Sequence, residues 1–129
     1  MKKIISVLLA FVLVFGISVS AFAVEEKQPL KFGEDGKFSI MHVTDTHLER
    51  DNIDASVWLI GQALDRENPD LVVITGDNVY NDDNAEITKG YITKLMNTFD
   101  ERDIPVAVTF GNHDSERGTM SREELMAFY

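Results

Sequence analysis

The sequence predicts an α/β fold in which three strands alternate with three helices. Short apolar runs typical of buried strands occupy residues 38–43, 70–75 and 106–110. A segment with helical signals follows each run, and strands that alternate with helices favour a mostly parallel sheet with right-handed crossovers. The chain has 129 residues, which is enough for one modest domain with a core of its own.

The first strand and the first helix are predicted from two different periodicities. Residues 38–43, "FSIMHV", form a short apolar run suited to a buried strand. In residues 51–68 the apolar side chains recur at helical spacing, and Asp51 or Asn52 is expected to cap the helix. These apolar side chains form a stripe that we expect to lie in the core, together with Trp58. The stripe consists of Ile53, Val57, Ile60 and Leu64.

The remaining elements repeat this pattern twice. Residues 70–75, "DLVVIT", are β-branched and continuous, as expected for a strand that is covered on both faces. A second helix is expected between residues 85 and about 102, and the third strand at 106–110. Residues 121–124, "SREE", are a capping box that begins a last helix. The apolar stripe of the second helix consists of Ile87, Tyr91, Leu95 and Phe99.

The N-terminus predicts export. Lys2 and Lys3 precede a long apolar stretch that ends in the small-x-small pattern Ala21-Phe22-Ala23, the layout of a secretory signal peptide cleaved after Ala23. An uncleaved anchor is the alternative, because the apolar stretch is just long enough to span a bilayer. We expect residues 1–23 to be removed, residues 24–37 to form a polar arm, and the mature protein to be secreted without a stable membrane anchor.

Composition excludes several classes of function. The formal net charge is -10 and the pI about 4.6, so no nucleic-acid partner is expected. The absence of cysteine excludes a disulfide framework, thiolate metal ligands and a cysteine nucleophile.

Polar side chains follow each predicted strand at the point where the strand ends. The motifs are "DTH" after the first strand, "GDN" after the second and "GNHD" after the third. Taken singly, each has a structural explanation as a turn or a lone ion pair. Because parallel strands share one carboxyl edge, we expect Asp45, His47, Asp77 and Asn112 to face the same small volume. Carboxylate oxygen and imidazole nitrogen suit Mn, Fe or Zn.

These three motifs resemble the first three motifs of the calcineurin-like metallophosphoesterases, written D-x-H, G-D-x-x and G-N-H-[DE]. The stretches "PDLVVITGDNVY" and "FGNHDSERGTMSREELMAFY" are most similar to the purple-acid-phosphatase-like branch, and the resemblance covers residues 37–129. It implies a hydrolase of phosphate esters, expected to act on monoesters with a hydroxide activated by two metal ions. The fold that it implies is the N-terminal βαβαβα half of an αββα sandwich.

The resemblance also assigns metal ligands. Asp45 and His47 would hold the first metal ion, Asp77 would bridge both ions, and Asn112 would hold the second. Tyr80 occupies the place of a tyrosine that binds ferric iron in true purple acid phosphatases, which lack the histidine of D-x-H. Since His47 is present here, we expect His47 to be the ligand and Tyr80 to pack, with a tyrosinate ligand as the alternative.

The same resemblance assigns the remaining site residues to catalysis. Asn112 and His113 would face the substrate, and His113 would protonate the leaving oxygen while Asp114 orients its ring. His42 lies within the first strand, where we expect a hydrogen-bonded core histidine.

The chain departs from the family in its C-terminal motifs. The family needs a further histidine and a G-H-x-H motif after GNHD, whereas this sequence contains three histidines in all, at 42, 47 and 113. We therefore expect the chain to be the N-terminal part of a phosphoesterase domain spanning 38–129, which needs a C-terminal half to complete its site. A catalytically inactive exported module of the same fold is the alternative. Aspartyl phosphatase chemistry is disfavoured because His47, not a second aspartate, follows Asp45 two residues later.

Overall fold

The structure, a computed structural model, describes residues 29–80, 84–116 and 119–129. The predicted signal peptide at 1–23 and the first part of the predicted arm therefore lie outside the described residues. Within the described ranges, no helix is long and apolar enough to cross a membrane.

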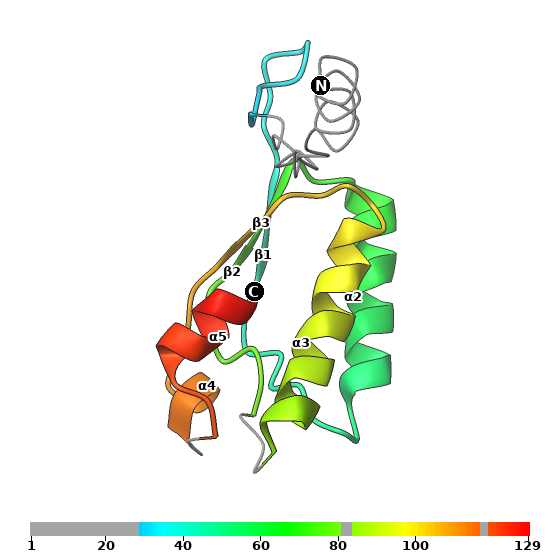
Figure 1. Cartoon of the computed structure of the whole chain (residues 1–129). Coiled ribbons are helices and arrows are strands. Elements are labelled where there is room, and N and C mark those ends of the chain that lie inside the picture. The colour runs from blue at the N-terminus through cyan, green and yellow to red at the C-terminus, as the bar shows by residue number, and fades with distance from the viewer. Residues whose placement is uncertain (1–28, 81–83, 117–118) are drawn as a thin grey trace, which may run out of the picture.

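A parallel sheet of three strands forms the centre of the fold, in the order β1-β2-β3 (Figure 1). The strands are β1 (Ile40–Val43), β2 (Leu71–Ile74) and β3 (Val106–Val108). In the register, Val73 of β2 lies between His42 of β1 and Ala107 of β3. The predicted α/β class and parallel sheet are confirmed, although each strand is shorter than its apolar run.

The two long helices cover one face of the sheet. They are α2 (Ile53–Glu67) and α3 (Ala85–Asp100). Because the strands lie side by side in chain order, two right-handed crossovers bring both helices to the same face. Two short helices, α4 (His113–Glu116) and α5 (Arg122–Phe128), lie on the other side near the carboxyl ends of the strands (Figure 1). The short helix α4 is not among the helices that the sequence predicts.

Side-chain caps explain where two of the helices begin. The Asn84 side chain accepts hydrogen bonds from two backbone N–H groups in the first turn of α3. Ser121 and Glu124 form the complete capping box that was predicted for α5. Asn52 precedes α2 but makes no side-chain cap. Its side chain instead accepts from the Glu49 N–H and donates to the His47 carbonyl, which ties the loop after β1 to the start of α2.

The core lies between the sheet and the two long helices, and it follows the predicted stripes. Val72 and Ile74 of β2 are fully buried beneath Leu64 of α2 and Leu95 and Phe99 of α3. Trp58 is an exception: it is 65% exposed on α2, so its predicted place in the core is wrong. Trp58 lies outside the apolar stripe of α2, and only the residues of the helix that point at the sheet are shielded from water.

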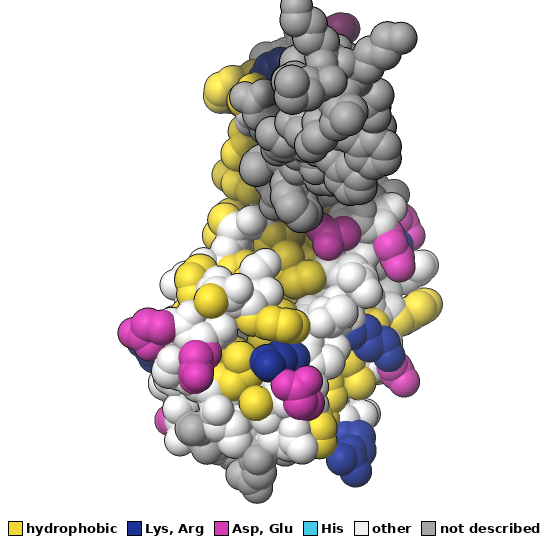
Figure 2. All heavy atoms as spheres, in the orientation of Figure 1, with side chains coloured by type: hydrophobic (Ala, Val, Ile, Leu, Met, Phe, Trp, Pro, Cys, Tyr) yellow, Lys and Arg dark blue, Asp and Glu magenta, His cyan; other side chains and the backbone are white. Residues whose placement is uncertain are grey.

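The second face of the sheet is largely uncovered in the described residues. Val72 and Ile74 are buried, while Leu71 and Val73 of the same strand are half-buried. Ile40 is 58% exposed, and hydrophobic side chains are visible between α5 and the pair of long helices (Figure 2). The prediction that the second strand is covered on both faces is thus not met here. His42 also lies exposed, with Nε2 2.6 Å from the Thr75 hydroxyl, and is not a core histidine.

Candidate metal centre

The loop after β1 carries Asp45 and His47 in an unusual backbone conformation. Their φ angles are +55° and +42°, in the left-handed region that non-glycine residues rarely adopt. Neighbouring backbone bonds hold this conformation in place. The Asp45 N–H donates to the Gly76 carbonyl and the His47 N–H to the Asp77 carbonyl, so the loops after β1 and β2 run side by side beyond the sheet. Backbone strain of this kind is concentrated at functional sites.

Two glycines allow the loops after β2 and β3 to meet. Gly76 has φ +109°, and a Cβ there would lie 2.8 Å from the Gly111 Cα. A Cβ on Gly111 would in turn collide with the Asp77 carboxylate. Asp77 itself has φ +52°, and its Oδ1 accepts the His113 N–H at 2.9 Å. The absence of side chains at both glycines is therefore what lets Asp77 reach the start of α4.

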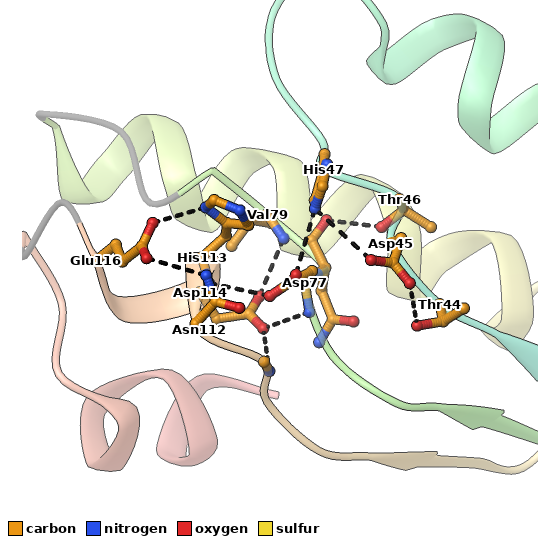
Figure 3. Close-up of polar contacts among 12 residues, drawn as sticks. Thr44, Asp45, Thr46, His47, Asp77, Val79, Asn112, His113, Asp114 and Glu116 are labelled. Atoms are coloured by element: carbon orange, nitrogen blue, oxygen red, sulfur yellow. Dashed lines mark hydrogen bonds and ion pairs between the residues drawn. The ribbon is translucent and has the colours of Figure 1, made fainter.

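Side chains from all three loops converge on one point (Figure 3). His47 Nε2 lies 3.5 Å from Asp77 Oδ2. One ligand atom each from His47, Asp77 and His113 can be chosen so that all three lie within 4.8 Å of one another. The predicted meeting of the three strand ends is confirmed for these residues. The group differs from the predicted ligand set, however, because it includes His113 and does not include Asp45.

Asp45 and Asn112 lie at the rim of this group. The Asp45 side chain is 62% exposed, with Oδ1 4.0 Å from His47 Nε2, and it accepts a hydrogen bond from the Thr44 hydroxyl. Asn112 is exposed, and its amide nitrogen donates to Glu116. Their roles as metal ligands stay predictions.

Tyr80 packs against both histidines. Its ring centroid lies 4.8 Å from that of His47 and 5.2 Å from that of His113, and the two histidine rings lie 5.0 Å apart. Tyr80 thus forms one wall of the site. This is the position expected for the packing role, and the choice between packing and tyrosinate ligation stays a prediction.

Asp114 contacts the backbone of two loops. It is fully buried, and its two oxygens accept hydrogen bonds from four backbone N–H groups, those of Asp77, Asn78, Val79 and Gly111. The carboxylate that contacts the His113 ring is instead that of Glu116, with Oε2 2.7 Å from Nδ1. We had expected Asp114 to orient the ring, but its recorded bonds fix the loops that carry the site.

Glu116 is the site residue that sequence reasoning missed. It follows Asn112 by four residues and His113 by three, and it contacts both side chains. Residues at these spacings share one face of a helix. The signal was present in "NHDSE" but depended on a helix, α4, that the sequence analysis did not anticipate.

The electrostatics of the group favour an ionised Asp77. The backbone N–H of His113, which donates to the carboxylate, lowers the pKa of Asp77 below its ordinary value, and the His47 ring acts in the same direction. Asp77 is therefore an anion at neutral pH, as a metal ligand must be.

The group fits a cation. His47 Nε2 is buried 3.5 Å from Asp77 Oδ2 and has no hydrogen-bond partner among the described residues, so it is placed to act as a ligand when it carries no proton. An anionic carboxylate and imidazole nitrogens suit Mn, Fe or Zn.

Comparison with known proteins agrees with this chemistry. The family model described as "Calcineurin-like phosphoesterase" matches residues 38–129. "Probable inactive purple acid phosphatase 28" of Arabidopsis thaliana is 31% identical over 116 residues, which cover 78% of this chain and 29% of the relative. "Phosphatase DCR2" of Saccharomyces cerevisiae is 33% identical over 113 residues, 76% of this chain and 19% of the relative.

A third relative covers nearly the whole chain. "Probable inactive purple acid phosphatase 14" of Arabidopsis thaliana is 30% identical over 144 residues, 98% of this chain and 35% of the relative. The chain thus spans between about a fifth and a third of the length of these curated relatives. No solved structure matches the chain significantly.

Proposed function

The chain belongs to the calcineurin-like phosphoesterase family, and on that premise we propose that it is the N-terminal part of an exported, metal-dependent enzyme that hydrolyses phosphate monoesters. The observation that supports this most directly is the convergence of His47, Asp77 and His113 from three different strand ends. Such an edge of a parallel sheet is where ligand sites of α/β folds form.

Asp45, His47, Asp77 and Asn112 would hold the two metal ions. Asp77 has two carboxylate oxygens, which allows it to serve both ions at once. When bound, such ions neutralise the charge of phosphate oxygens and lower the pKa of water, so that water can attack phosphorus in line. The described residues provide fewer ligands than two complete shells need. We propose that residues from a following C-terminal half supply the others.

The chain's own residues then bind and move protons. The His113 ring lies against His47 and Tyr80 at the mouth of the group, where it can protonate the leaving oxygen of the ester. Asp114 keeps the loops in register through its four backbone hydrogen bonds. Because water would attack phosphorus directly, the proposed reaction needs no covalent enzyme intermediate.

A second candidate function is a catalytically inactive exported module of the same fold that binds metal without hydrolysis. Two of the three relatives described above carry the word "inactive" in their names, which is the observation that favours it. The two candidates predict the same cation binding and differ only in turnover.

The test is an assay of the protein that carries this chain together with a C-terminal half. It should hydrolyse 4-nitrophenyl phosphate in the presence of Mn, Fe or Zn, and a chelator should abolish this activity. Asp45→Asn should lower the rate strongly. The matched control Asp103→Asn, at an exposed left-handed position away from the site, should leave it unchanged. Bound metal without hydrolysis would support the second candidate, and neither metal nor hydrolysis would contradict both.

Export is tested separately. If residues 1–23 are a signal peptide, the protein recovered outside the cytoplasm should begin at Val24 on N-terminal sequencing. A protein that retains its N-terminus in the membrane fraction would favour the uncleaved anchor.

A further inference from the structure

The carboxylate of Glu116 contacts two site residues at once. Its Oε1 accepts a hydrogen bond from Asn112 Nδ2 at 2.9 Å, and its Oε2 lies 2.7 Å from His113 Nδ1. Figure 3 shows the two contacts side by side, on the side of Asn112 and His113 away from His47 (Figure 3). A single side chain therefore holds the predicted metal ligand and the predicted general acid together.

The contact with Asn112 fixes the orientation of its amide. An ionised carboxylate can only accept hydrogen bonds, so it must face the NH₂ end of the amide. Asn112 Oδ1 is then the free end of the side chain. Carbonyl oxygen binds metal ions and amide nitrogen does not, so Glu116 presents the one end of Asn112 that can act as a ligand.

The contact with His113 fixes its tautomer in the same way. A carboxylate 2.7 Å from Nδ1 requires the proton to be on Nδ1. Nε2 is then the ring nitrogen left for the substrate.

The neighbouring acid cannot take over this role. Both oxygens of Asp114 are occupied by backbone N–H groups, and the residue is fully buried. The Glu116 side chain, in contrast, is 53% exposed, and within the part of the chain that the structure describes its side-chain partners are Asn112 and His113. The contacts with Asn112 and His113 therefore hold the Glu116 side chain in place.

We propose that Glu116 is a positioning residue that sets the amide orientation of Asn112 and the tautomer of His113 together. The proposal rests on the proposed function for its catalytic consequence. The tautomer and the amide orientation are properties of the chain itself and can be measured whether or not the protein hydrolyses phosphate.

Two substitutions separate the two contacts. Glu116→Ala removes both. In Glu116→Gln, one amide oxygen can still accept from His113, but the NH₂ group then faces the NH₂ of Asn112. Either Asn112 rotates its amide to relieve this clash, which turns Nδ2 toward the metal site, or the glutamine amide turns over and the His113 proton moves to Nε2. The matched control is Glu123→Gln, an exposed acid in the first turn of α5 that makes no side-chain hydrogen bond or ion pair to the described residues.

The first measurement is the ¹⁵N shift of the His113 ring nitrogens in the ¹⁵N-histidine-labelled protein, assigned by loss of the signal in His113→Ala. The unsubstituted protein and Glu123→Gln should show the proton on Nδ1. Glu116→Ala should shift toward a mixture of tautomers. An unchanged tautomer in Glu116→Ala would overturn the proposal, even in a protein without turnover.

The second measurement compares metal affinity and leaving groups. Glu116→Ala should bind Zn or Mn about 10- to 100-fold more weakly, as is usual when a residue that orients a ligand is lost. Glu116→Gln should either show the same loss of affinity or have the His113 proton on Nε2. Glu116→Ala should lose more rate on an alkyl phosphate, whose leaving group needs a proton, than on 4-nitrophenyl phosphate. Equal losses on both substrates with unchanged metal affinity would contradict the proposal. No activity and no metal binding in the unsubstituted protein would instead contradict the proposed function, leaving the tautomer measurement to decide on Glu116.

Discussion

At the scale of single residues, the site depends on a strained backbone conformation that directs its side chains toward one another. Asp45, His47 and Asp77 all have positive φ angles. A non-glycine residue in this region carries strain on the order of 1 kcal/mol or more. The hydrogen bonds between the loops after β1 and β2 offset this strain. The result is that the side chains of neighbouring loops turn toward one another at the edge of the sheet.

Replacing His113 with alanine should lower the rate without removing metal. His113 acts as the general acid in the proposed mechanism, and loss of such a group usually lowers the rate about 10²–10⁴-fold. Steady-state kinetics together with metal analysis of the purified variant checks this. A ligand atom of His113 lies within 4.8 Å of ligand atoms of His47 and Asp77, so His113 could also bind the metal ion. Loss of metal in the variant would show that His113 is a ligand and not the acid.

Replacing Asp114 with alanine should destabilise the fold. Four backbone N–H groups would lose a charged acceptor in a fully buried place, and each buried donor without a partner costs about 1–3 kcal/mol. We expect the free energy of unfolding to fall by about 3 kcal/mol or more, measured by urea denaturation. Ser115→Ala, next to it on α4, is the control and should change stability little. A small loss for Asp114→Ala would mean that water replaces the carboxylate.

These residues also show where sequence reasoning was sufficient. Asp77 and His47 could be placed because strand ends in a parallel sheet must share one edge. The contact between Glu116 and His113 could not, because it depends on four residues forming a helix turn whose stability comes from tertiary packing. The hydrogen bonds of Asp114 to the backbone also could not be predicted from the sequence. Apart from Gly111, its partners lie 35 to 37 residues away, so they become neighbours only in the folded chain.

At the scale of elements, a side-chain contact ties the amino ends of two strands together. Asp70, just before β2, accepts hydrogen bonds from the backbone N–H and the hydroxyl of Ser39, just before β1. The N–H of Asp70 donates back to the Ser39 carbonyl. This reciprocal pair fixes the register in which Ile40 lies opposite Leu71.

Asp70→Asn should remove part of the acid sensitivity of the fold. The Ser39 N–H, and then its hydroxyl, lower the pKa of Asp70. A depressed pKa means that the carboxylate stabilises the folded state above about pH 4, the unfolded value, and that this stabilisation is lost as the pH falls through the lower folded value. Melting temperatures at pH 3 and pH 6 should therefore differ less in Asp70→Asn than in the unsubstituted protein. An equal difference would show that Asp70 does not contribute.

Element boundaries show the limits of local pattern. The predicted second helix was expected to reach about residue 102, whereas α3 ends at Asp100. The third strand ends at Val108, before its apolar run does. Phe110, at the end of that run, packs instead against Tyr129, with ring centroids 5.8 Å apart. A run of apolar residues predicts which residues are buried but not where a strand ends. Here the partly buried apolar residues continue beyond the end of β3 to Phe110.

At the scale of the whole molecule, one face of the sheet decides how the chain behaves alone. The long helices bury Val72 and Ile74, while Ile40 and Leu71 on the other face remain at least partly exposed. An uncovered apolar face and unpaired strand edges promote association. The chain spans only 29% of one of its relatives, and we propose that a C-terminal half covers this face.

Residues 24–129 expressed alone should therefore associate, bind little metal and lack phosphatase activity. The mass in solution, measured by light scattering, should exceed that of the monomer, and co-expression with the proposed C-terminal half should restore a soluble active protein. A monomeric fragment with steady turnover would contradict this expectation, and would mean that the described residues complete the site by themselves.

The central claim is that the carboxyl edge of the sheet binds metal through Asp77, and metal content measures it directly. The protein that carries this chain with its C-terminal half should bind two ions per chain by elemental analysis. Asp77→Ala should bind fewer ions and lose its activity, because one carboxylate serves both. The control Asp103→Asn should retain both ions. An Asp77→Ala variant that keeps two tightly bound ions and normal turnover would contradict the account.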